Sequence, residues 1–122
     1  MICAFDVLGP PQPKERARAG LSGRHFTPKR TRAYEQLVGT VAELRRPATW
    51  PLDARYHVEL RVYFGDARAR DVDNVAKSIL DGLNRVLWRD DRQVMRIVVE
   101  KSIDRQRPRV EIVAALVPKV TP

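Results

Sequence analysis

The sequence predicts a single α+β domain in which two helices cover a mixed or antiparallel β-sheet. The length of 122 residues suits one domain. Hydrophobic residues make up 43% of the chain, which is enough for a buried core. Apolar patterns follow in the order strand, helix, strand, helix, strand, strand. We therefore treat residues 1–122 as one domain.

The first strand and the first helix are expected in the N-terminal part of the chain. Residues 2–8 read as a strand that a Gly-Pro-Pro sequence ends, and residues 9–27 as a long loop. Thr27 followed by Pro28 is a suitable N-cap and first-turn pair for a helix that runs to about Arg46.

The second half of the chain is expected to contain one helix and the remaining strands. Residues 55–64 alternate apolar and polar side chains, as a half-buried strand does. Asp73 or Asn74 then caps a helix, and residues 93–103 and 109–117 form two more strands. The apolar stripe of this helix is Val75, Ile79, Leu83 and Val86, with Leu80 and Leu87 beside it.

The charge of the chain favours a polyanionic partner. Lys and Arg number 23 against 15 Asp and Glu, so the net charge is +8, and nucleic acid and anionic membrane surfaces both remain possible partners. Cys3 is the single cysteine, which precludes a disulfide within the chain. The sequence has neither a signal-peptide pattern nor an apolar run near the roughly 20 residues of a membrane span. We expect a soluble, cytoplasmic protein.

Aspartates gather in one part of this basic chain. All six acidic residues between positions 66 and 91 are aspartates, and they are Asp66, Asp71, Asp73, Asp81, Asp90 and Asp91. If the strands framing these turns are neighbours, the 71/73 and 90/91 pairs can converge on one cation. Carboxylates without His or Cys suit Mg²⁺ or Mn²⁺. Taken singly, each aspartate is better explained by helix capping or by a turn, but together, with Lys77 four residues after Asp73, they favour a metal site.

The aspartates also allow two other interpretations, a calcium-binding loop and a helical ion-pair ladder. An EF-hand loop starting at Asp71 would need an oxygen ligand, a glycine and a glutamate where this chain has Val75, Ala76 and Gly82, so that interpretation fails. Lys77 follows Asp73 by four residues and precedes Asp81 by four. This spacing fits a solvated helical ion-pair ladder and a lysine beside a metal site equally well.

A basic segment precedes the first helix. Seven basic residues stand between positions 14 and 32 against one acid, Glu15, and they are Lys14, Arg16, Arg18, Arg24, Lys29, Arg30 and Arg32. We favour contact with a phosphate backbone over an ordinary solvated surface.

Taken together, these motifs resemble the RusA family of Holliday junction resolvases. Residues 70–77 read Arg-Asp-Val-Asp-Asn-Val-Ala-Lys, residues 81–83 Asp-Gly-Leu, and residues 88–94 Trp-Arg-Asp-Asp-Arg-Gln-Val. Residues 13–18 resemble the N-terminal element of that family, and Lys101 fits a lysine found after the acidic turn. Ala17 departs from the proline that is usual at its position.

The resemblance implies a homodimeric, Mg²⁺-dependent endonuclease that resolves four-way or other branched DNA by paired symmetric nicks, of a kind often encoded by prophages. The implied metal ligands are Asp71, Asp73 and Asp91, with Asp90 and Asn74 in support. Lys77 would be a catalytic or phosphate-contacting lysine. The implied DNA contacts are Lys14, Arg16, Arg18, Arg70 and Lys77.

A non-catalytic nucleic-acid-binding module is the alternative function. Such a module accounts for the positive charge and for the basic segment, but it leaves the aspartates without a role. Metal-dependent nicking of a four-way junction distinguishes the two functions.

Overall fold

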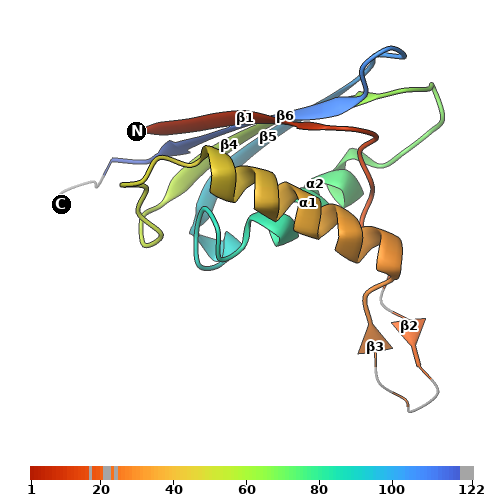
Figure 1. Cartoon of the computed structure of the whole chain (residues 1–122), viewed down its shortest axis with the longest axis horizontal. Helices are drawn as coiled ribbons and strands as arrows, with labels where there is room; N and C mark the ends of the chain where they lie inside the picture. The colour runs from red at the N-terminus through yellow and green to blue at the C-terminus, as the bar shows by residue number, and fades with distance from the viewer. Residues whose placement is uncertain (17, 21–22, 24, 119–122) are drawn as a thin grey trace.

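A computed structural model describes the chain except for residues 17, 21–22, 24 and 119–122. The main sheet has the order β1-β6-β4-β5, and two helices pack on one of its faces (Figure 1). The predicted α+β architecture, with two helices on a mixed sheet, is confirmed. The elements are β1 (Ile2–Leu8), α1 (Lys29–Arg45), β4 (Tyr56–Phe64), α2 (Val72–Leu83), the 3-10 helix η1 (Asp91–Gln93), β5 (Val94–Ile103) and β6 (Arg109–Leu116).

The sheet contains both strand orientations. β6 pairs antiparallel with β1 and with β4, whereas β4 and β5 run parallel. Two strands that run parallel need a crossover between them, and α2 provides it. As a consequence, the end of β4 and the start of β5 lie at opposite ends of this strand pair.

The core lies between the sheet and the two helices. Alternate residues of β1, β4 and β6 are buried, which matches the period of two that their sequences carry. At the start of β4 the rings of Trp50 and Tyr56 stack with 5.6 Å between their centroids, and the Trp88 ring lies 5.4 Å from that of Tyr56. Cys3 is buried in this core.

Two glycines allow α1 and α2 to approach closely. A Cβ atom added to Gly82 would lie 2.7 Å from the Glu35 carbonyl oxygen, and one added to Gly39 would lie 2.9 Å from the Gly82 carbonyl oxygen. Larger side chains at this crossing would force the helices apart.

The expected loop over residues 9–27 contains a small hairpin. β2 (Arg18–Ala19) pairs with β3 (His25–Phe26), and this hairpin extends away from the body beyond the first turn of α1 (Figure 1). Strands of two residues carry no detectable periodicity, which is why the sequence pattern missed them.

Several helix boundaries also differ from the prediction. Pro28, rather than Thr27, occupies the N-cap position of α1, and it makes no side-chain capping bond. Asp71 is at the N-cap of α2, ahead of the expected Asp73 or Asn74. α2 ends at Leu83, so Val86 and Leu87 lie in the following turn, where Leu87 is still buried in the core.

Candidate active site

The start of α2 presents three of the predicted catalytic side chains to solvent. Asp71 stands at the N-cap, Asp73 in the first turn and Lys77 one turn further, and all three residues are exposed. One Asp73 carboxylate oxygen accepts the Asn74 backbone N–H at 3.0 Å. The buried faces of Val75 and Ile79 anchor the helix in the core. The exposed carboxylates are therefore accessible to a cation, and to a phosphate that such a cation binds.

The loop before Asp71 is held by ion pairs. The Arg70 guanidinium donates two hydrogen bonds to the Asp66 carboxylate, at 2.8 and 3.1 Å, and it lies over the Phe64 ring at 4.5 Å. The Arg70 guanidinium, and after it the Arg68 backbone N–H, lower the pKa of Asp66 to about 2. The Lys101 ammonium donates to the Arg70 carbonyl oxygen at 2.8 Å. The backbone that enters the Asp71 position is thus tied to the end of β5.

The second aspartate pair lies in the turn before β5. Asp90 caps η1, since its carboxylate accepts from the Arg92 backbone N–H at 2.8 Å and from the Arg92 side chain at 3.1 Å. The backbone bond from Arg92, more than its side chain, lowers the pKa of Asp90. Asp91 follows at the first position of η1. The geometry makes Asp90 a capping residue that supports the placement of Asp91.

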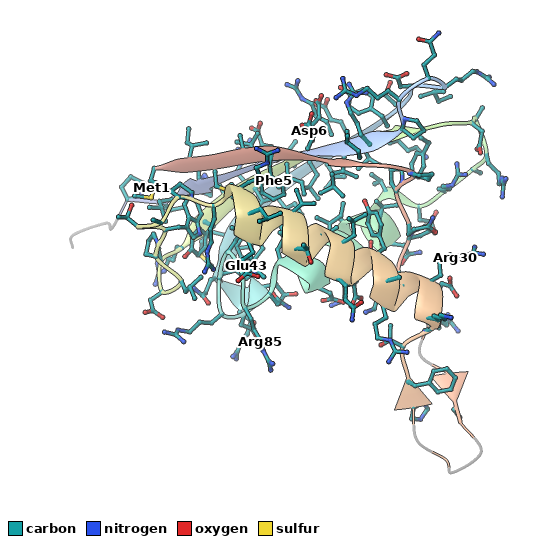
Figure 2. All side chains as sticks on the ribbon, in the orientation of Figure 1. Met1, Phe5, Asp6, Arg30, Glu43 and Arg85 are labelled. Carbon is teal, nitrogen blue, oxygen red and sulfur yellow. The ribbon has the colours of Figure 1, made fainter. Side chains whose placement is uncertain are left out.

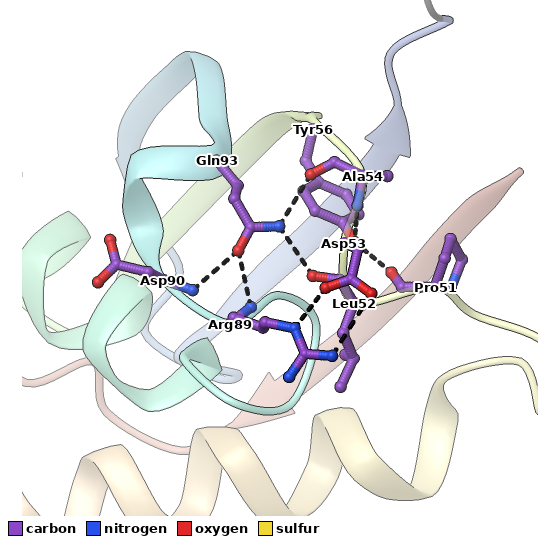
Figure 3. Close-up of polar contacts among 8 residues, drawn as sticks. All are labelled: Pro51, Leu52, Asp53, Ala54, Tyr56, Arg89, Asp90 and Gln93. Carbon is purple, nitrogen blue, oxygen red and sulfur yellow. Dashed lines mark hydrogen bonds and ion pairs between the residues drawn. The ribbon is translucent and has the colours of Figure 1, made fainter.

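Gln93 is a positioning residue that sequence reasoning missed (Figure 3). Its side-chain oxygen accepts the backbone N–H groups of Arg89 and Asp90, both at 3.0 Å. Its amide nitrogen donates to the carbonyls of Leu52 and Ala54, both at 2.8 Å. One side chain therefore fixes the acidic turn to the segment before β4. The Asp-x-x-Gln spacing of a capping box was the signal that could have identified it.

The two aspartate pairs do not meet within one chain, contrary to the expectation that they converge. Among the described residues, no group of three or more His, Cys, Asp or Glu side chains is placed to hold a metal ion. Asp71 follows the C-terminal end of β4, whereas Asp91 precedes the N-terminal end of β5. β4 and β5 are neighbours, but they run parallel, so α2 separates the two pairs.

The predicted DNA-contacting residues have different surroundings. Arg16 is exposed, and no hydrogen bond or ion pair of its side chain is found within the described part of the chain. Lys14 is paired internally with Glu35 and Asp81, at 2.5 and 3.0 Å, and Arg70 is paired with Asp66. Arg18 contributes its backbone to β2, whereas Ala17 and Arg24 are outside the described residues.

The sequence of this chain matches the model of a known protein family. The family model described as "Endodeoxyribonuclease RusA" matches residues 9–114. The chain belongs to the RusA family. The match begins directly after β1 and ends within β6, and so it includes both aspartate pairs, Lys77 and the basic segment. The protein is accordingly an endodeoxyribonuclease of the Holliday junction resolvase class.

One bacterial protein is similar to this chain over most of the length of both proteins. The "Uncharacterized protein YqaN" of Bacillus subtilis (strain 168) is 27% identical over 131 aligned positions, which cover 88% of this chain and 92% of that protein. No helix in the described part of the RusA-family chain has the length and apolar character needed to cross a membrane.

Proposed function

We propose that this RusA-family protein cuts four-way or similarly branched DNA by paired symmetric nicks, as a homodimer and with Mg²⁺ or Mn²⁺ as its metal. The observation that carries the proposal is the exposed group of Asp71, Asp73 and Lys77 on consecutive turns of α2, within the family's motif. A junction-cutting enzyme of this kind would work in the cytoplasm.

The donor set fits a hard divalent cation. Asp71 and Asp73 offer exposed carboxylate oxygens, which Mg²⁺ and Mn²⁺ prefer, and Asp91 would add another. When bound, such a metal activates the attacking water and stabilises the leaving oxygen. Lys77 would hold the scissile phosphate and neutralise the charge that develops on its oxygens. Asp90 would keep Asp91 in place through its cap of η1.

A second copy of the chain would complete this site. β5 has 10 residues, and at about 3.3 Å per residue its two ends lie on the order of 30 Å apart. β5 is also an edge strand, and among the described residues no strand pairs with its outer side. Antiparallel pairing of two β5 edges about a two-fold axis would bring the start of one β5 beside the end of the other. Asp91 of one protomer would then approach Asp71 and Asp73 of its partner.

The surface of β5 agrees with such an interface. Met95, Ile97 and Ile103 are 49%, 39% and 47% exposed. An exposed edge strand with large apolar side chains associates readily with another strand. Pairing with a second copy would satisfy the free backbone groups of β5 and cover these side chains. Two sites related by a two-fold axis would also suit two nicks placed symmetrically on a junction.

The remaining basic residues would bind DNA backbone. Arg16 and Arg18 belong to the segment that forms the projecting hairpin, and Arg30 lies at the end of α1 from which that segment departs (Figure 2). Asp6 lies on the opposite side of the molecule, on the sheet face away from α1 and α2 (Figure 2). DNA would therefore approach from the side of the helices and the hairpin. Arg70 would act chiefly by holding the Asp71 loop.

Cutting of synthetic junctions tests the proposal. The parent protein should nick a four-way junction in Mg²⁺, and it should leave linear duplex intact and cut neither substrate in EDTA. Asp73→Asn should slow junction cutting by at least about a hundredfold, while junction binding persists. Asp6→Asn, an equal change on the sheet face away from α1 and α2, should cut at the parental rate.

Two results would reject the catalytic assignment. Junction cutting by Asp73→Asn at the parental rate would remove Asp73 from the site. Junction binding by the parent without cutting in either Mg²⁺ or Mn²⁺ would favour the alternative, a non-catalytic nucleic-acid-binding module.

A further inference from the structure

Lys14, one of the predicted DNA contacts, has surroundings unlike those of a phosphate contact. Its ammonium lies 2.5 Å from a carboxylate oxygen of Glu35 in α1 and 3.0 Å from one of Asp81 in α2. The three side chains are only 24%, 20% and 19% exposed. Two carboxylates surround this ammonium, so it has little charge left to offer to DNA.

The backbone around Lys14 is attached to both helices. The Lys14 backbone N–H donates to the Asn74 carbonyl at 2.8 Å. The Ser78 hydroxyl donates to the Gln12 carbonyl at 2.6 Å, and the Glu15 N–H donates to the Thr31 hydroxyl at 3.1 Å. Thr31 and Ser78 are the fully buried polar residues found in the described part of the chain. Both serve to bind this segment, because a buried hydroxyl needs a hydrogen-bond partner.

We propose that Lys14, Glu35 and Asp81 form a clamp that positions the basic segment on α1 and α2, and that Lys14 itself contacts no phosphate. The clamp holds the segment at the point where it leaves the body, so the direction of Arg16 and of the hairpin depends on it. Arg16, two residues later, is exposed and remains a predicted phosphate contact. This inference rests on the proposed function for its DNA-binding consequence.

The clamp also reaches the candidate active site. Asp81 accepts Lys14 through one carboxylate oxygen and lies 3.4 Å from the Lys77 ammonium through the other. Lys77 is 56% exposed and lies on the same helix face as Asp73. Asp81 is therefore shared between the lysine that anchors the basic segment and the lysine assigned to the scissile phosphate. We expect Lys14 and Asp81 to act as positioning residues for the basic segment and for Lys77.

The salt dependence of junction binding separates the two roles for Lys14. Binding is measured in Ca²⁺, to separate it from cutting, over a series of salt concentrations with folded protein. Arg16→Met should weaken binding and lower the slope of log K against log salt by about 0.9, the value for one lost phosphate contact. Lys14→Met should weaken binding by about tenfold with an unchanged slope, since it displaces the segment without removing a contact. Lys14→Arg should restore the affinity.

A second measurement needs no DNA. Trypsin should cleave after Arg16 and Arg18 about tenfold faster in Lys14→Met than in the parent, because the segment detaches locally. Glu35→Gln with Asp81→Asn should give the same increase, whereas Asp6→Asn should not.

Two outcomes overturn the clamp. One is a loss of slope in Lys14→Met equal to that of Arg16→Met, which makes Lys14 a phosphate contact. The other is a trypsin cleavage rate that Lys14→Met leaves unchanged. A parent protein that binds no junction would reject the proposed function, and the trypsin result would still decide whether the clamp exists.

Discussion

At the scale of single residues, charge pairing determines what each basic side chain contributes. Lys14, Arg70 and Arg109 all hold carboxylates of their own chain, and Arg109 also lies over the Tyr63 ring at 3.9 Å. Their charges count toward the net +8, yet they are neutralised by ion pairs within the chain. Arg16 is exposed and free to meet a phosphate. Counting basic residues therefore overstates the surface that DNA meets.

The pairing of Asp66 with Arg70 predicts a pH dependence of stability. The pKa of Asp66 is lowered in the fold from 3.8 to about 2, so the pair stabilises the fold above the ordinary pKa and loses that effect as pH falls toward 2. Urea unfolding of the parent and of Asp66→Asn should therefore differ at neutral pH. The difference should shrink as pH falls through 3.8 and vanish near 2. A difference that stays constant down to the lowest pH would contradict the ion pair.

At the scale of elements, the crossing of α1 and α2 is the most constrained contact. Gly82 faces the Glu35 carbonyl and Val38, with no space for a methyl group. The same crossing brings Glu35 and Asp81 close enough to share Lys14. Helix packing and the clamp are thus consequences of one close approach.

Substitution of Gly82 tests this packing. Gly82→Ala should lower the free energy of unfolding by about 2 kcal/mol, because the added methyl group overpacks the crossing. Gln36→Ala, an exposed change on α1, should stay within about 0.5 kcal/mol of the parent. Equal stability of the Gly82→Ala and Gln36→Ala proteins, measured by urea unfolding, would contradict the close approach.

The elements that the sequence predicted correctly are those with a long apolar pattern. β4 alternates over nine residues and α2 carries a buried stripe, so both were visible. The β2–β3 hairpin was missed because its strands are two residues long. The pairing of Lys14 was missed because charge counts do not reveal partners that are distant in sequence, such as Glu35, which lies 21 residues away.

The separation of the aspartate pairs was within reach of sequence reasoning. A strand–helix–strand unit favours parallel strands joined by a crossover. Applied to residues 55–103, that rule places the residues after the first strand and those before the second at opposite ends. The motif indicates the correct family, but convergence of its aspartate pairs within one chain is incompatible with two parallel strands. The assignment of Asp71, Asp73 and Asp91 to one metal site remains a prediction.

At the scale of the whole molecule, the account depends on a site shared between two copies. One chain presents Asp71 and Asp73 at the start of α2, and Asp91 in η1, which follows α2 along the chain. In a two-fold dimer each site would combine the first pair from one protomer with Asp91 from its partner. Loss of the dimer should then abolish cutting even when every chain is folded.

Mixed dimers of two inactive variants test this claim most directly. Asp73→Asn and Asp91→Asn chains, carrying different tags, are expressed together and the mixed dimer is purified through both tags. A shared site predicts that the mixed dimer nicks junctions, because one of its two sites contains neither substitution. The matched control, a mixed dimer of Asp71→Asn with Asp73→Asn, should stay inactive because each of its sites carries one substitution. If the Asp73→Asn/Asp91→Asn dimer is as inactive as either variant by itself, the shared site is wrong.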